Sequence, residues 1–194
     1  MSNPNLIGAA LVHRTKRVNL AMLGNLVPLL NPVRVAEEYS MLDVMSGGRV
    51  IAGMMRGIPH EYIAYNVPPS DSRERLREAV ALIIKAWTEP EPFGWEGQFY
   101  QFPAVSIWPR PYQKPHPRLL MSGTNEESVE FVAQHKAKLG IVLIADLALA
   151  RANIDLYHKV ARAYGWEPVP EDILIGHHTC IADTDEEARE HMRK

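Results

Sequence analysis

Apolar residues follow two alternating patterns along this chain. Five short runs are continuously apolar, as expected for strands whose two faces are both covered in a parallel sheet. Each run is followed by a segment with helical spacing, which predicts an α/β fold built from about five strand–helix units. The five predicted strands occupy residues 18–27, 49–54, 118–122, 139–144 and 173–182.

Helix-boundary residues agree with this alternation. Asn31 and Pro32 suit the N-cap and first position of a helix, and Gly47 suits a left-handed helix end. Asp71 and Glu74 have the spacing of a capping box at the start of a later helix. The apolar stripe of that later helix comprises Leu76, Val80, Ile83, Ile84 and Trp87.

One segment, residues 89–117, breaks the alternation because it is rich in proline and aromatic residues. We predict a short β excursion around residues 98–102, followed by an extended return into the strand at 118. The aromatic side chains of the segment are expected to form a private core of the excursion. They are Trp95, Phe99, Tyr100, Phe102 and Trp108.

Five units are too few for a closed (β/α)8 barrel, which needs about 250 residues. A doubly wound sheet is disfavoured because the sequence contains neither a G-x-G-x-x-G loop nor a P-loop. The opening residues 5–15 have the pattern of a helix whose preceding strand is missing. The sequence therefore predicts one incomplete TIM-barrel-type domain over residues 1–194, and favours a fragment of a longer protein.

Composition narrows the function classes. The 194 residues are 46% hydrophobic and 23% charged with a net charge of -2, so no basic excess points to nucleic acid. No apolar run reaches the roughly 18 residues of a membrane span, and the first residues lack a secretion signal. One cysteine fits a reducing compartment. We expect a cytoplasmic protein.

Candidate chemistry lies where the predicted strands end, since parallel α/β folds bind ligands at the carboxyl ends of their strands. Small hydroxyl residues at a helix start, with an arginine on a neighbouring strand end, describe a phosphate site. The candidate binding residues are Gly24, Asn25, Arg56, Gly57, Ser122, Gly123, Thr124, Asn125 and Ser128.

Simpler interpretations exist for the single residues. Taken alone, Arg56 is more often a surface or salt-bridged arginine, and Thr124 or Asn125 is more often only an N-cap. No metal site is expected, because His177 and His178 are neighbours on a predicted strand and would point to opposite faces. The single cysteine, at position 180, is expected to be a small buried residue.

Several motifs, taken together and in order, resemble the bacterial luciferase-like flavin-dependent monooxygenase family. The resemblance covers nearly the whole chain, which makes it more specific than any one motif. It rests on Glu78 and on residues 31–38, 42–43, 46–49, 53–57, 86–88, 97–100, 109–113, 115–117 and 122–128.

The resemblance implies a (β/α)8 barrel that binds reduced FMN or, in a related branch, the deazaflavin F420. Such enzymes receive reduced flavin from a partner reductase and use O2 to oxygenate a small apolar organic substrate. An F420-dependent oxidoreductase, a non-catalytic flavin-binding protein and an interaction fragment remain alternatives for this chain.

The resemblance also assigns roles to the candidate residues. Arg56 and Gly57 match the phosphate-binding strand end, and residues 123–125 with Ser128 match the phosphate and ribityl side. Gly24 and Asn25 match a strand bulge, often with a non-proline cis peptide, under the isoalloxazine ring. The five strands correspond to the third through seventh of eight. The catalytic residue is therefore unknown, since the family carries it on the absent second strand.

The absence of the first two strands and the last strand of the barrel would affect stability. The predicted strands at 18–27 and 173–182 would present unpaired edges and exposed apolar side chains. We therefore predict that the 194-residue chain is marginally stable, aggregation-prone or a homo-oligomer.

Overall fold

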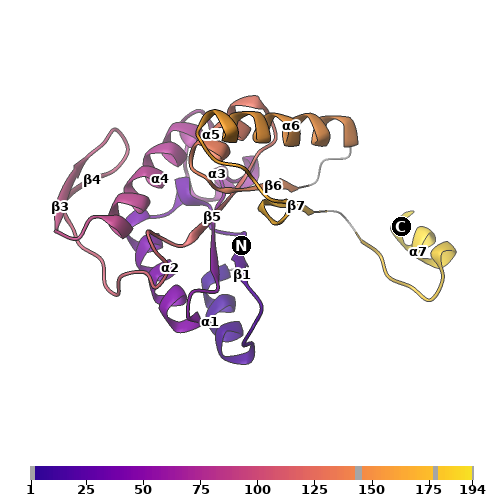
Figure 1. The fold of residues 1–194 in the computed structure, drawn as a ribbon, viewed down its shortest axis with the longest axis horizontal. Coiled ribbons are helices and arrows are strands. Elements are labelled where there is room, and N and C mark those ends of the chain that lie inside the picture. The colour runs from indigo at the N-terminus through magenta and orange to yellow at the C-terminus, as the bar shows by residue number, and fades with distance from the viewer. Residues whose placement is uncertain (1–2, 143–145, 177–178, 194) are drawn as a thin grey trace.

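A five-stranded parallel sheet forms the centre of the molecule (Figure 1). The computed structural model describes residues 3–142, 146–176 and 179–193. All four strand pairings are parallel, in the order β1-β2-β5-β6-β7, which confirms the predicted α/β sheet. The strands are β1 (Leu20–Met22), β2 (Val50–Met54), β5 (Arg118–Ser122), β6 (Lys138–Val142) and β7 (Ile173–Gly176).

The two outer strands are shorter than predicted. Strand β1 has three residues because the chain turns away after Met22, and residues 179–182 belong to no strand. The prediction about His177 and His178 lies outside the described residues. Within the described sheet β1 and β7 are edges, and Ile175 of β7 and Val142 of β6 are 51% and 40% exposed. The expected exposure of apolar edge residues is found at Ile175 of β7 but not in β1, where Leu20 and Met22 are each 5% exposed because α1 packs on that strand. The oligomeric state stays a prediction.

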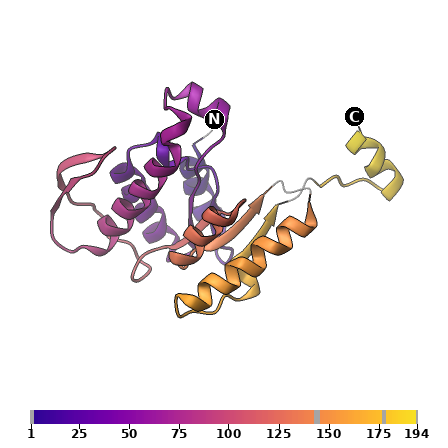
Figure 2. The same ribbon diagram turned by 90° about the horizontal axis from the view of Figure 1, so that it is seen from above.

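Helices follow the strands and pack on one another in chain order. Contacts join α1 to α2, α2 to α4 and α5 to α6, and Figure 2 shows α5 and α6 side by side. None of the helices in the described residues is long and apolar enough to cross a membrane. They are α1 (Pro4–Arg14), α2 (Pro32–Ser46), α3 (Pro59–Ala64), α4 (Ser72–Thr88), α5 (Glu126–Gln134), α6 (Leu147–Ala163) and α7 (Asp185–Arg193).

The boundaries of α2 are those that its sequence predicts. The Asn31 side chain accepts hydrogen bonds from the N–H groups of Val33 and Arg34, and Gly47 ends the helix with a φ of 65°. The capping box predicted at Asp71 is wrong. A 3₁₀ turn (Pro69–Asp71) precedes α4, so Asp71 already has helical dihedral angles and its side chain caps nothing.

The excursion is an antiparallel hairpin of β3 (Phe93–Glu96) and β4 (Gln101–Val105). The Glu78 carboxylate of α4 holds this hairpin by accepting hydrogen bonds from Trp95 Nε1 and from the N–H groups of Phe99 and Tyr100, at 2.9–3.2 Å. The expected private core is wrong, because most of these aromatic rings pack on the main core, whereas Trp108 is 73% exposed.

Cys180 also differs from its prediction. It lies beyond the end of β7 and is only partly buried, so it is not a core residue. The described strand β7 spans Ile173–Gly176 and residues 179–182 belong to no strand, so Cys180 is not part of the sheet that builds the core.

Candidate functional site

A cleft of about 500 Å³ opens at the carboxyl ends of β1, β2, β5 and β6. Six of the nine candidate residues line it, which brings together segments up to about 70 positions apart in the chain. Those six are Arg56, Gly57, Ser122, Thr124, Asn125 and Ser128. Apolar side chains form much of the remaining wall, among them Leu23, Leu26, Met54, Met121, Phe131 and Val142.

Arg56 lies just beyond β2, on one lip of the cleft. It is exposed and forms no hydrogen bond or ion pair with any residue that the structure describes. Gly57 follows with a φ of 98°, a conformation that favours glycine, and the Tyr62 hydroxyl donates to its carbonyl at 2.8 Å. The chain thus turns directly into α3 and leaves the guanidinium of Arg56 available to an anion.

The start of α5 forms the facing side. Asn125 is its N-cap, and the Asn125 Oδ1 atom accepts from Ser128 N at 3.0 Å. The Ser128 hydroxyl accepts from the N–H groups of Thr124 and Asn125 at 2.9 and 3.1 Å. The turn is therefore held in shape by its own side chains, and the positive end of the helix dipole faces the cleft.

Gly123 does not line the cleft but allows this turn to form. It is buried, and a Cβ atom there would lie 2.5 Å from Leu139 Cδ1 and 2.9 Å from Val129 Cγ2. Its N–H donates to Gly140 O at 3.0 Å, which continues the β5–β6 pairing to the end of the strand. Its contribution is close packing of the strand end against α5.

Two cleft arginines were missed by sequence reasoning. Arg73 and Arg77 come from α4, and both pair with Glu127 in the first turn of α5. Arg77 Nη1 also lies 3.0 Å from Glu74 Oε1. The only sequence signal was the spacing of two arginines on one face of α4, and their partner lies 50 or more positions away along the chain.

Gly24 and Asn25 lie beside the cleft rather than in it. Both line a smaller cavity of about 210 Å³, and Leu26 lines both spaces. Where the resemblance implies a strand bulge, the structure has a turn between two parallel pairs, Met22 with Ala52 and Leu26 with Met55; we call residues 23–25 the β1 bulge. Between these two pairs the chain that continues β1 has one more residue than the chain that continues β2.

The bulge brings two backbones unusually close. A Cβ atom on Gly53 would lie 2.0 Å from the Met22 carbonyl oxygen, so only glycine fits without a shift. The cis peptide expected in the bulge is not found there. The cis bonds of the described residues precede Pro109 and Pro115, in the return from the hairpin.

Comparison with known proteins identifies the family. The family described as Luciferase-like monooxygenase matches residues 2–194. The chain belongs to the luciferase-like monooxygenase family. The incomplete barrel inferred from the sequence is confirmed by this membership and by the five-stranded parallel sheet.

Relatives at moderate identity are monooxygenases by name. The chain is 28% identical to the oxygenase component of flavin-dependent trigonelline monooxygenase from Acinetobacter baylyi, over 96% of this chain and 52% of the relative. It is 32% identical in sequence to monooxygenase RslO1 from Streptomyces bottropensis, with a TM-score of 0.89 over 97% of this chain and 58% of that chain. The chain spans about half the length of the curated relatives it matches.

Two further solved structures share the fold. The oxygenating constituent of 3,6-diketocamphane monooxygenase from Pseudomonas putida, in complex with FMN, has a TM-score of 0.83 at 22% identity and covers 97% of this chain and 56% of its own. An F420-dependent secondary alcohol dehydrogenase in complex with an F420-acetone adduct has a TM-score of 0.76 at 20% identity and covers 90% and 53%. At these identities the likeness concerns the fold alone.

Proposed function

We propose that this chain is the flavin-binding part of a monooxygenase that uses reduced FMN and O2 on a small apolar organic substrate. A separate flavin reductase would supply the reduced flavin. The observation that carries the proposal is the cleft of about 500 Å³ with Arg56 on one lip and the α5 start on the other. The single cysteine supports a reducing compartment, and we place the protein in the cytoplasm.

The cleft residues fit FMN in charge and in shape. An exposed guanidinium that has no partner within the described part of the chain, opposite a helix N-terminus, suits a phosphate group. Arg73 and Arg77 add positive charge, although Glu127 offsets part of it. The apolar wall suits a flat ring system, because transfer of an apolar ring from water to an apolar surface is favourable in free energy.

Each group of residues has a distinct task in this proposal. Arg56 and the first turn of α5 would bind the phosphate and thereby fix one end of the cofactor. Leu23, Met54 and Met121, which line the cleft, would hold the ring and exclude water from it. FMN, when bound, supplies the reaction with O2 for which protein side chains are unsuited.

An F420-dependent oxidoreductase is the second candidate, since the fold is shared with an F420 enzyme. Such an enzyme would transfer hydride and would need no O2. The same lip arginine and helix start would serve either cofactor, because both are phosphorylated. Binding must therefore be measured for both.

Titration of the purified 194-residue chain with FMN, F420 and riboflavin tests the proposal. FMN should bind more tightly than riboflavin, which has no phosphate. Arg56→Ala should weaken FMN binding by about 1.5–3 kcal/mol, roughly 10- to 150-fold in Kd. Arg17→Ala is the matched control, because Arg17 is also exposed but precedes β1, at the amino ends of the strands.

The outcomes separate the candidates. Tighter binding of F420 than of FMN would replace the first proposal by the second. A chain that binds none of the three would favour an interaction fragment. An Arg56→Ala variant with unchanged FMN affinity would show that Arg56 is an ordinary surface arginine and does not bind the phosphate.

A further inference from the structure

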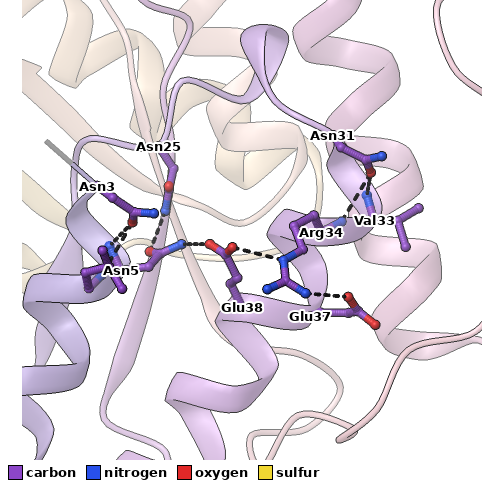
Figure 3. A network of polar contacts seen from close by, with 9 residues as sticks. Asn3, Asn5, Asn25, Asn31, Val33, Arg34, Glu37 and Glu38 are labelled. Carbon is purple, nitrogen blue, oxygen red and sulfur yellow. Dashed lines mark hydrogen bonds and ion pairs between the residues drawn. The ribbon is translucent and has the colours of Figure 1, made fainter. Parts of the chain in front are cut away.

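A chain of polar side chains runs from the β1 bulge to the surface of α2 (Figure 3). Asn25 Nδ2 donates to Asn5 Oδ1 at 2.8 Å, and Asn5 Nδ2 donates to Glu38 Oε2 at 2.7 Å. Glu38 in turn pairs with the exposed Arg34 at 3.2 Å. Asn5 and Asn25 are only 6% and 2% exposed, so the inner bonds are shielded from water.

Tyr39 connects the same amide to strand β2. Its hydroxyl accepts from Asn25 Nδ2 at 2.7 Å and donates to Gly53 O at 2.7 Å. The side chain is fully buried, and this burial raises the pKa of the Tyr39 hydroxyl. It therefore remains protonated and keeps its bond to the Gly53 carbonyl.

The backbone of Asn25 is tied to the residue beside Arg56. Met55 N donates to Asn25 O at 3.0 Å, and Val27 N donates to Met55 O at 3.0 Å. Arg56 follows Met55 directly. A shift of the bulge is therefore transmitted through these two bonds to the start of the Arg56 turn.

The bulge needs this support because it lies on an edge of the described sheet. Strand β1 has three residues and pairs only with β2 in that sheet. A bulge interrupts the ladder, so fewer backbone bonds hold it than hold a regular strand. Side-chain bonds to Asn25 replace the missing ladder bonds.

We propose that Asn25 is a positioning residue, which through Asn5 and Tyr39 fixes the bulge and so sets where Arg56 enters the cofactor cleft. The inference rests on the proposed flavin function. The Asn25 side chain does not itself contact the cleft. It lines the smaller cavity, and its amide forms hydrogen bonds with Asn5 and Tyr39. This role differs from the ring support that the family resemblance implies for the backbone of Gly24 and Asn25.

The ratio of riboflavin Kd to FMN Kd measures the phosphate contact alone and tests the proposal. Asn25→Ala and, separately, Tyr39→Phe should lower this ratio about 5-fold or more while riboflavin affinity changes less than about 2-fold. Arg34→Ala is the control within the same network, because Arg34 is 66% exposed in its side chain and its loss should leave the ratio unchanged.

A double-mutant cycle with Arg56→Ala separates positioning from general damage. If Asn25 acts through Arg56, Asn25→Ala should change the ratio little once Arg56 is already alanine. The proposal would be overturned if Asn25→Ala weakened the binding of FMN and of riboflavin equally. It would also be overturned if the effects of Asn25→Ala and Arg56→Ala on the ratio were fully additive.

Amide hydrogen exchange gives a readout that needs no flavin. Asn25→Ala should make the Met55 N–H exchange about 10-fold faster or more, because its acceptor is Asn25 O. The Gly123 N–H, bonded to Gly140 O in another part of the sheet, should keep its rate. Unchanged exchange at Met55 would overturn the positioning role. Failure of the wild-type chain to bind flavin would instead overturn the proposed function.

Discussion

Replacing Gly53 with alanine tests the close approach between the β1 bulge and β2. The added Cβ atom would lie 2.0 Å from the Met22 carbonyl oxygen, whereas ordinary contacts at a Cβ begin near 3.4 Å. The two backbones would therefore have to separate by about 1.4 Å. The three nearest atoms are all backbone atoms, of Met22 and Leu23, so no flexible side chain can absorb the shift.

The expected cost has two parts. Overpacking a core site costs about 1–3 kcal/mol. The separation would also weaken the 2.7 Å hydrogen bond from the Tyr39 hydroxyl to Gly53 O, which contributes about 1 kcal/mol. We expect the free energy of unfolding to fall by about 2–4 kcal/mol, out of the roughly 5–15 kcal/mol typical of a domain.

Urea denaturation followed by tryptophan fluorescence measures this difference. Gly140→Ala is the matched control, because Gly140 is also a strand glycine facing a neighbouring carbonyl. Its Cβ atom would lie 3.3 Å from Met121 O, so the cost should be below about 1 kcal/mol. If Gly53→Ala unfolds at the same urea concentration as Gly140→Ala, the reasoning about the bulge is refuted.

Other predictions follow from the packing. Glu78→Ala should leave three hairpin donors without their acceptor and lower the free energy of unfolding by about 2–4 kcal/mol, measured by urea denaturation. Burial raises the pKa of Tyr39 and Tyr157 in the folded state, so stability should be full below the ordinary tyrosine pKa of 10.0 and fall as the pH rises above it. Tyr157→Phe should flatten that fall, and denaturation at pH 8 and pH 11 measures it. Ile175→Lys should reduce self-association in sedimentation velocity, because it places a charge on the exposed edge strand β7. Unchanged association would show that the chain does not associate through β7.

Local signals predicted the elements well because their physics is local. The N-cap at Asn31 and the left-handed stop at Gly47 satisfy backbone groups within a few residues, so the sequence alone determines them. The continuous apolar runs likewise predicted all five strands of the parallel sheet. Asp71 failed as a cap because a proline-started 3₁₀ turn competes for the same residues.

Tertiary structure decided the candidate site. The sequence indicated Arg56 and the α5 start as candidates for one phosphate site, since carboxyl ends of parallel strands share an edge. It could not show that Arg73 and Arg77 share Glu127, or that the Asn25 side chain bonds to Asn5 and Tyr39 and does not line the cleft. Those facts depend on distances between residues far apart in the chain, which only the packing of helices on the sheet sets. The sequence by itself therefore determined that the Arg56 strand end and the α5 start share one edge of the sheet, and the fold determined that α4 joins them and which side chains face the cleft.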